Sequence, residues 1–198
     1  MGKVINSITV DLADGKPSSA ESTYPVGVTI CLVCGGGNTR WQGVFRHNHP
    51  LFLGCSRMIC ADCEMVFTAP MPTDADLANY NSSYFLTAHG GLPSSPMAQA
   101  FFMGIARLRL AFLRRFLAKH QIDVVRVLEL GPGPGFFTRC WLEQMPQSIY
   151  SALETDNSTH EELLKLGVKL LYAADEVSTD LVVMSHVLEH VTDPISFV

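Results

Sequence analysis

Hydrophobic and polar positions follow two different periods along the chain. From Met97 to about His120, apolar residues recur at helical spacing with arginines between them, which predicts an amphipathic helix that covers a sheet. We interpret the arginines as the solvent-exposed face of this helix rather than as a phosphate-binding site.

Beyond this helix, apolar runs of strand length alternate with helical patterns. The predicted strands are 124–130, 149–153, 169–172 and 181–185, and the predicted helices are 136–145 and 158–166. This alternation is typical of a parallel, doubly wound sheet in an α/β fold.

The first part of the chain differs in composition, with more turn-forming residues and shorter apolar runs. Residues 1–28 mix Ser, Pro, Gly and Asp and are interpreted as a loosely held leader without a function. Residues 29–72 contain short apolar runs punctuated by Gly and Pro, which suit the small hairpins of a zinc-ribbon-like domain. Residues 73–120 form a linker, with one short helix and a mobile loop before the amphipathic helix. Residues 121–198 are predicted to form the N-terminal part of a doubly wound, Rossmann-like domain.

Composition limits the possible partners. The chain has 198 residues, 47% hydrophobic and 17% charged, which indicates a globular protein. A net charge of -5 disfavours binding to nucleic acid or to an acidic membrane surface. The chain shows no signal-peptide pattern, and its apolar stretch at 100–117 is interrupted by arginines, so we predict no membrane attachment. A cytoplasmic location and a small-molecule partner fit these features.

Four cysteines form two C-x2-C pairs, Cys31 with Cys34 and Cys60 with Cys63. Each pair closes a tight turn that aims two sulfurs at one point, so the two pairs supply the four thiolates of a tetrahedral structural Zn²⁺ site. So small a unit buries little apolar surface, and zinc would supply the missing folding free energy. Cys55, His47 and His49 are close enough in sequence to compete as ligands, but we interpret them as bystanders.

A Gly-rich turn, V-L-E-L-G-P-G-P-G, spans 127–135 and connects a predicted strand to a predicted helix. A dinucleotide site is disfavoured because Phe136 stands where its third Gly or Ala belongs, and because Pro132 and Pro134 lack the N–H groups of a phosphate cradle. Glu129 would repel a pyrophosphate but suits a ligand with an ammonium group and a nearby sulfonium, as in S-adenosyl-L-methionine.

Glu154 lies about twenty residues after the turn, where a carboxylate can accept hydrogen bonds from both hydroxyls of a ribose. Its position at the end of the second predicted strand supports the same ligand independently. The alternative is that Glu129 and Glu154 are merely solvated strand ends.

Three segments resemble successive motifs of class I S-adenosylmethionine-dependent methyltransferases: V-L-E-L-G-P-G-P-G-F-F-T, A-L-E-T-D and D-L-V-V-M-S-H-V-L-E-H-V-T-D-P. The last segment is similar to that of ubiquinone-biosynthesis-type enzymes. The upstream cysteine motifs and Y-N-S-S-Y-F resemble a subgroup with an N-terminal zinc-binding domain, which includes sugar C-methyltransferases. The resemblance covers roughly residues 29–198. It implies three further strands, so we expect a C-terminally incomplete chain, or a partner that covers the open edge of the sheet.

The resemblance also implies roles for individual residues. Gly131, Gly133 and Gly135, with Glu129, would contact the methionine part of the cofactor, and Glu154 would bind its ribose. Ser185 and His186 would border the methyl-donor pocket. Glu189 and His190 would lie near the acceptor, with His190 a candidate general base, although a backbone-bonded histidine at a helix start is the alternative. Tyr84 could reach the pocket from the linker, but we interpret it as an exposed loop residue.

The leading hypothesis is therefore methyl transfer from S-adenosyl-L-methionine to a small-molecule acceptor such as a sugar or related metabolite, with zinc in a structural role. The rival hypothesis is a binding module. In it, the zinc ribbon would recognise a protein or nucleic acid, and the truncated methyltransferase half would be inactive.

Overall fold

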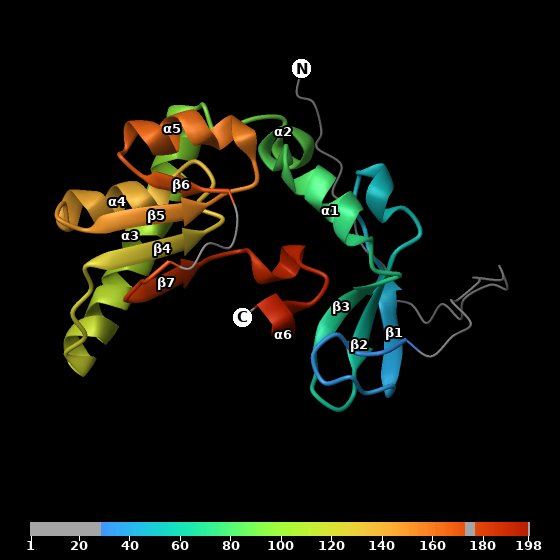
Figure 1. Cartoon of the computed structure of the whole chain (residues 1–198). Helices are drawn as coiled ribbons and strands as arrows, with labels where there is room; N and C mark the ends of the chain where they lie inside the picture. Colours follow the sequence, from blue (N-terminus) through green and yellow to red (C-terminus); the bar gives the residue numbers. More distant parts are fainter. Residues whose placement is uncertain (1–28, 173–176, 198) are drawn as a thin grey trace, which may run out of the picture.

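The computed structural model describes residues 29–172 and 177–197. The leader predicted at residues 1–28 lies outside the described residues. The described chain contains a small antiparallel sheet, two short helices, one long helix and a parallel sheet with its own helices (Figure 1).

The antiparallel sheet is built from β1 (Thr39–Val44), β2 (Ser56–Cys60) and β3 (Val66–Ala69), in the order β1-β2-β3. The register between β1 and β2 shifts between Trp41 and Gly43, which marks a bulge or irregularity. A short 3-10 helix, Pro50–Phe52, interrupts the connection between β1 and β2. The small core of this sheet consists of Cys31, Met58, Cys60, Phe67 and Ala69. Two of these five residues are cysteines of the predicted metal site, so the core and the site are one structure.

Three helices follow: α1 (Asp74–Asn81), α2 (Tyr84–His89) and α3 (Pro96–His120). The Thr73 side chain accepts a hydrogen bond from the Asp76 amide and begins α1, and Ser95 with Pro96 begins α3 in the same way. Helix α2 is a difference from the sequence-based expectation, which placed a loop after the first short helix. Gly90 ends α2 in a left-handed conformation.

The parallel sheet confirms the predicted α/β fold. Its strands are β4 (Arg126–Leu130), β5 (Ile149–Leu153), β6 (Lys169–Leu171) and β7 (Leu181–Met184), in the order β6-β5-β4-β7. All neighbours pair in parallel. The intervening helices are α4 (Phe136–Gln144) and α5 (His160–Lys165), and α6 (Pro194–Phe197) follows β7. The chain steps outward from β4 through β5 to β6 and then returns to the other side of β4. This reversal creates a switch point between β4 and β7, where open α/β sheets bind ligands.

The main core lies between this sheet and helices α3, α4 and α5. Its fully buried members include Leu110 from α3, Trp141 from α4 and Leu163 from α5. Val127 and Ala152 face the same core from β4 and β5. In the described residues β7 is an edge strand, and its Val182 side chain is 46% exposed.

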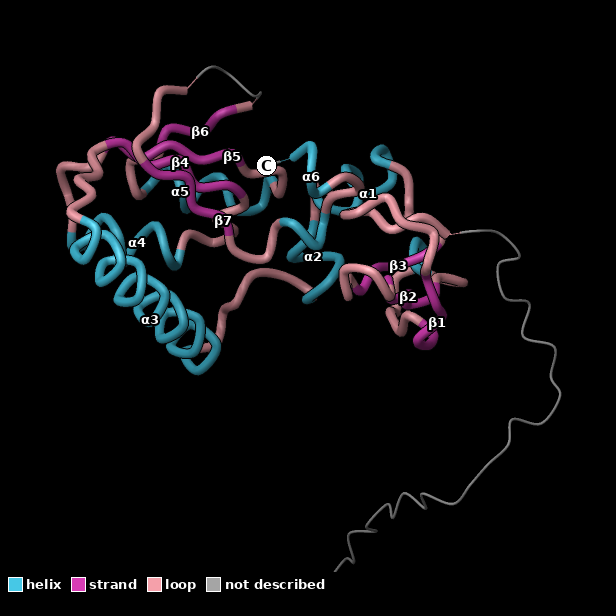
Figure 2. Tube along the Cα trace, turned by 90° about the horizontal axis from the view of Figure 1, so that it is seen from below, coloured by secondary structure: helices cyan, strands magenta, loops and turns pink. Residues whose placement is uncertain are grey.

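Helices α1 and α2 connect the two sheets (Figures 1 and 2). The Phe85 amide donates to the Asp156 carboxylate after β5 at 2.7 Å, and the Asn157 amide donates to the Ser82 carbonyl at 3.4 Å. On the other side, the Asn81 side chain donates to the His190 carbonyl at 3.5 Å. The pair α1–α2 therefore lies across the carboxyl ends of the parallel strands. Among the described residues, no helix has the length and apolar character needed to cross a membrane.

Candidate functional site

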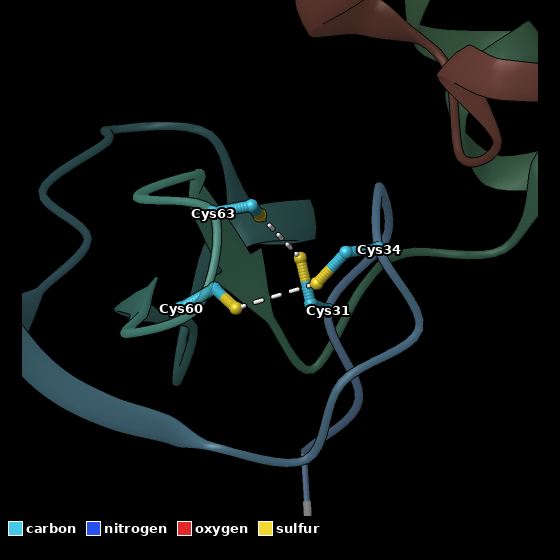
Figure 3. A group of neighbouring side chains, drawn as sticks. All are labelled: Cys31, Cys34, Cys60 and Cys63. Carbon is cyan, nitrogen blue, oxygen red and sulfur yellow. Dashed lines mark hydrogen bonds between the residues drawn. The ribbon is translucent and has the colours of Figure 1, made fainter.

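The structure brings the four predicted metal-ligand cysteines together (Figure 3). Cys31 and Cys34 lie before β1, and Cys60 and Cys63 lie at the end of β2 and in the turn that follows. All four sulfurs lie within 4.8 Å of one another, with Cys31 Sγ 3.5 Å from Cys63 Sγ and Cys34 Sγ 3.5 Å from Cys60 Sγ. A tetrahedron with zinc–sulfur bonds of about 2.3 Å places its sulfurs about 3.8 Å apart. The cluster is therefore consistent with Zn²⁺.

Backbone amides support a thiolate at this site. Hydrogen bonds from backbone amides, the strongest from Cys34 and a weaker one from Val33, lower the pKa of the Cys31 thiol to about 7. A backbone hydrogen bond from Gly36 lowers the pKa of Cys34 as well, but its contacts with the Cys60 and Cys63 thiols raise that pKa overall to about 12, so Cys31 is the cysteine poised as a thiolate without a metal. Cys31 and Cys60 are buried, whereas Cys34 and Cys63 are exposed. A closed set of four sulfurs leaves no coordination position for a substrate, so a metal ion held by these four residues would be structural rather than catalytic.

The neighbouring cysteine and histidines have other partners. The Cys55 thiol donates to the Pro70 carbonyl at 3.4 Å. His47 Nδ1 accepts from the His49 amide, and His47 Nε2 lies 3.4 Å from the Tyr80 hydroxyl on α1. His49 Nδ1 accepts from the Leu51 amide and begins the 3-10 helix. These histidines belong to an aromatic contact between the antiparallel sheet and α1, apart from the four-sulfur cluster.

The Gly-rich turn lies at the carboxyl end of β4, at the switch point. Gly131 and Gly133 have φ angles of 62° and 56°, a region that other residues rarely adopt. A Cβ atom on Gly131 would lie 2.8 Å from Val187 Cγ2, and one on Gly133 would lie 3.0 Å from Phe85 Cζ. Gly135 begins α4 with a φ of 75°. The turn thus needs glycine both for its backbone conformation and because α2 and the segment after β7 approach it closely.

Glu129 is buried just before this turn, with 4% of its surface exposed. Its Oε2 accepts hydrogen bonds from the Thr138 hydroxyl on α4 and the Tyr150 hydroxyl on β5, both at 2.6 Å. Burial raises the pKa of Glu129, although these two hydrogen bonds and the charge of Arg109 lower it in part. The interpretation of Glu129 as a solvated strand end is therefore wrong.

Glu154 is partly buried at the end of β5 and faces the Gly-rich turn. Its Oε2 accepts from the Gly133 amide at 2.7 Å, and its Oε1 accepts from the Asp156 amide at 2.8 Å. Each carboxylate oxygen has further acceptor capacity, so both can also receive a hydroxyl. The two carboxyl groups thus flank the turn from adjacent strands.

Ser185 and His186 follow β7 directly. His186 has a φ of 58°, an uncommon conformation for a residue with a side chain. Its Nε2 accepts from the Arg109 guanidinium of α3 at 2.8 Å, and its Nδ1 lies 2.9 Å from Glu189 Oε1. Because Nε2 accepts, the proton resides on Nδ1 and is donated to Glu189. Glu189 is therefore bound to His186 rather than to its neighbour His190.

Tyr84 and His190 meet although they are far apart in sequence. Their ring centroids lie 5.0 Å apart in an edge-to-face arrangement. Tyr84 is part of α2 and is half-buried, so the interpretation as an exposed loop residue is wrong. Burial lowers the pKa of His190, and burial together with the charge of Glu189 raises the pKa of Tyr84. At neutral pH the site therefore holds a neutral imidazole and a protonated phenol.

Some residues of this edge are missing from the sequence interpretation. Asp156 fixes α2, Phe85 covers Gly133, and Arg109 reaches His186. In the sequence, Arg109 is one of several arginines of α3, and nothing in the local pattern distinguishes it from those that do not contact His186. Such long-range contacts are not encoded in local patterns.

Comparison with models of known protein families gave no match, and comparison with curated proteins found no similar sequence.

Proposed function

We propose that this chain binds S-adenosyl-L-methionine and transfers its methyl group to a small-molecule acceptor such as a sugar or related metabolite. The observation that carries the proposal is the Gly-rich turn at the switch point, with Glu129 and Glu154 on either side of it. A structural Zn²⁺ held by Cys31, Cys34, Cys60 and Cys63 completes the proposal.

The residues at this edge fit the donor. Glu154 would accept the two ribose hydroxyls, and Glu129 would face the ammonium group. Both hydrogen bonds that Glu129 receives end on Oε2, so Oε1 has no hydrogen bond from the described residues. Because Gly131 and Gly133 have no Cβ atoms, the donor could approach the backbone of the turn closely. The prolines of the turn lack N–H groups, which suits a ligand that carries no phosphate.

When bound, the donor supplies an electrophilic methyl group on a sulfonium sulfur. An electron pair of the acceptor forms the new bond to carbon, and the pair of the broken sulfur–carbon bond stays on sulfur. The acceptor loses a proton, for which neutral His190 is the proposed base. Tyr84 and Glu189 would position the acceptor and the segment around His190. Since in-line transfer depends mainly on geometry, these residues would act chiefly by holding two reactants in place.

Calorimetric titration of the zinc-loaded chain with S-adenosylhomocysteine tests the proposal, with NAD as a parallel ligand. We expect saturable binding of S-adenosylhomocysteine alone. Gly133→Arg should abolish it, because a side chain at Gly133 collides with the Phe85 ring and fills the turn. Ala118→Arg adds the same charge on the exposed surface of α3 and should bind normally.

Zinc content and far-UV circular dichroism establish that both variants are folded. Unchanged affinity of Gly133→Arg would refute the assigned pocket. No binding of S-adenosylhomocysteine by the folded parent chain would refute the enzyme hypothesis for this chain and favour the binding-module alternative.

A further inference from the structure

Arg109 is placed differently from the other arginines of its helix. Arg107, Arg114 and Arg115 are exposed along α3, whereas Arg109 is partly buried. Its guanidinium extends to the segment after β7 and donates to His186 Nε2 at 2.8 Å. The positive charge also acts on the buried carboxyl group of Glu129, on the central strand β4. Arg109 therefore belongs to the carboxyl edge of the parallel sheet and not to the solvated face of α3.

Arg109 makes no direct ion pair with a carboxylate of the described residues. His186 is bound through a lone pair, so it accepts as a neutral imidazole and cannot balance a charge. A guanidinium has five N–H donors in a planar fork that matches a carboxylate, and the contact with His186 occupies only part of that fork.

The charges at this edge are also complementary to a zwitterion. Glu129 presents a buried acidic group, and Arg109 presents a cation close enough to shift the pKa of that group. An α-amino acid carries an ammonium and a carboxylate on one carbon atom. A ligand of this kind could place its ammonium at Glu129 while its carboxylate binds the guanidinium, so that the acidic group and the guanidinium each gain a partner of opposite charge.

We propose that Arg109 is the carboxylate-binding residue for the amino-acid part of the bound ligand. The proposal rests on the function proposed above and assigns a residue outside the motifs that suggested it. His186 acts as a positioning residue, because its bonds to Arg109 on one side and to Glu189 on the other hold the guanidinium beside the segment after β7. The strained backbone of His186 is consistent with such a fixed role.

The test compares two ligands on three proteins by calorimetry. The ligands are S-adenosylhomocysteine and its decarboxylated analogue, which retains the nucleoside, the sulfur and the amine but lacks the carboxylate. The proteins are the parent chain, Arg109→Gln and Arg115→Gln, the last being a matched loss of charge at an exposed position of α3. We expect Arg109→Gln to weaken S-adenosylhomocysteine by about tenfold to a hundredfold, as for a lost charge-assisted hydrogen bond.

The same variant should change the affinity for the decarboxylated analogue by less than about threefold, since that ligand lacks the interaction. Arg115→Gln should bind both ligands as the parent does, and Arg109→Lys should fall between, because it retains charge without the fork. Equal weakening of both ligands by Arg109→Gln would make Arg109 a structural residue and overturn this inference, while leaving the proposed function intact. Failure of the parent chain to bind either ligand would overturn both.

Discussion

At the scale of single residues, the carboxyl group of Glu129 connects the core of the parallel sheet to the proposed ligand site. It connects β4 to α4 through Thr138 and to β5 through Tyr150, yet burial opposes its ionisation. A cationic ligand group beside Oε1 would favour the ionised form. The sequence indicates an acidic residue before the turn, but its burial depends on a helix and a strand that follow later in the chain.

Glu129→Gln should make stability less dependent on pH. Because the folded pKa of Glu129 is raised, the unfolded chain loses its proton first as pH rises above about 4.3, and the folded state becomes relatively less stable. The amide of the variant does not ionise, so its folded state has no buried charge to form as pH rises. The free energy of unfolding of the variant, relative to that of the parent, should therefore increase with pH over this range. Urea unfolding at several pH values measures this difference, with Glu143→Gln on the exposed face of α4 as the control. A pH-independent difference would contradict the buried, proton-linked carboxyl group.

The cysteines allow an equally local prediction about the metal. Cys60→Ser removes one of four converging sulfurs, so zinc should be lost or bound at least about tenfold more weakly. Cys55→Ser changes a buried thiol that donates only to the Pro70 carbonyl, and should retain one zinc per chain. Native mass spectrometry of the two variants counts the metal directly. A zinc-free Cys55→Ser variant that is still folded would place Cys55 among the ligands.

At the scale of elements, much of the order of helices and strands follows from hydrophobic periodicity. The strands of the parallel sheet and helices α3 and α4 were predicted to within a few residues. Helix α2 was not, since its six residues are too few to show a helical period. It begins at Tyr84, and the amide of the next residue, Phe85, donates to Asp156, which lies more than seventy positions away. Contacts of this length are invisible in a local pattern.

Helix α3 offers a matched test of which face holds it in place. Leu110 is fully buried against the sheet, whereas Leu108 is 74% exposed on the same helix. Leu110→Ala should lower the free energy of unfolding by about 2–5 kcal/mol, as expected for a cavity in a packed core. Leu108→Ala should change it by less than about 0.5 kcal/mol. Chemical denaturation of both variants measures this contrast, and equal destabilisation would mean that the exposed face of α3 is covered in solution.

At the scale of the whole molecule, α1 and α2 pack against both the four-cysteine sheet and the carboxyl edge of the parallel sheet, and so link the two. Tyr80 on α1 contacts His47 and His49, and Tyr84 on α2 contacts His190. Phe85 lies against Gly133 between these contacts. The sequence predicts a metal module and a separate parallel sheet, but it does not reveal that the connecting helices pack against the candidate site at the carboxyl edge of that sheet. That arrangement depends on aromatic packing between segments far apart in the chain.

Metal removal should therefore affect the edge of the parallel sheet as well as the four-cysteine sheet. We expect a strong chelator to increase hydrogen exchange of the amides in β2 and β3 and also in α2, because loss of the thiolate centre releases His47 and His49 from Tyr80. The amides of β4 and β5 should stay protected, since their core contains no cysteine of the cluster. Exchange measured by mass spectrometry on peptides from each segment resolves the three regions, and re-addition of zinc should restore protection. If α2 remains fully protected while β2 and β3 exchange, the Asp156 contact alone holds α2, and the metal module does not support the ligand site.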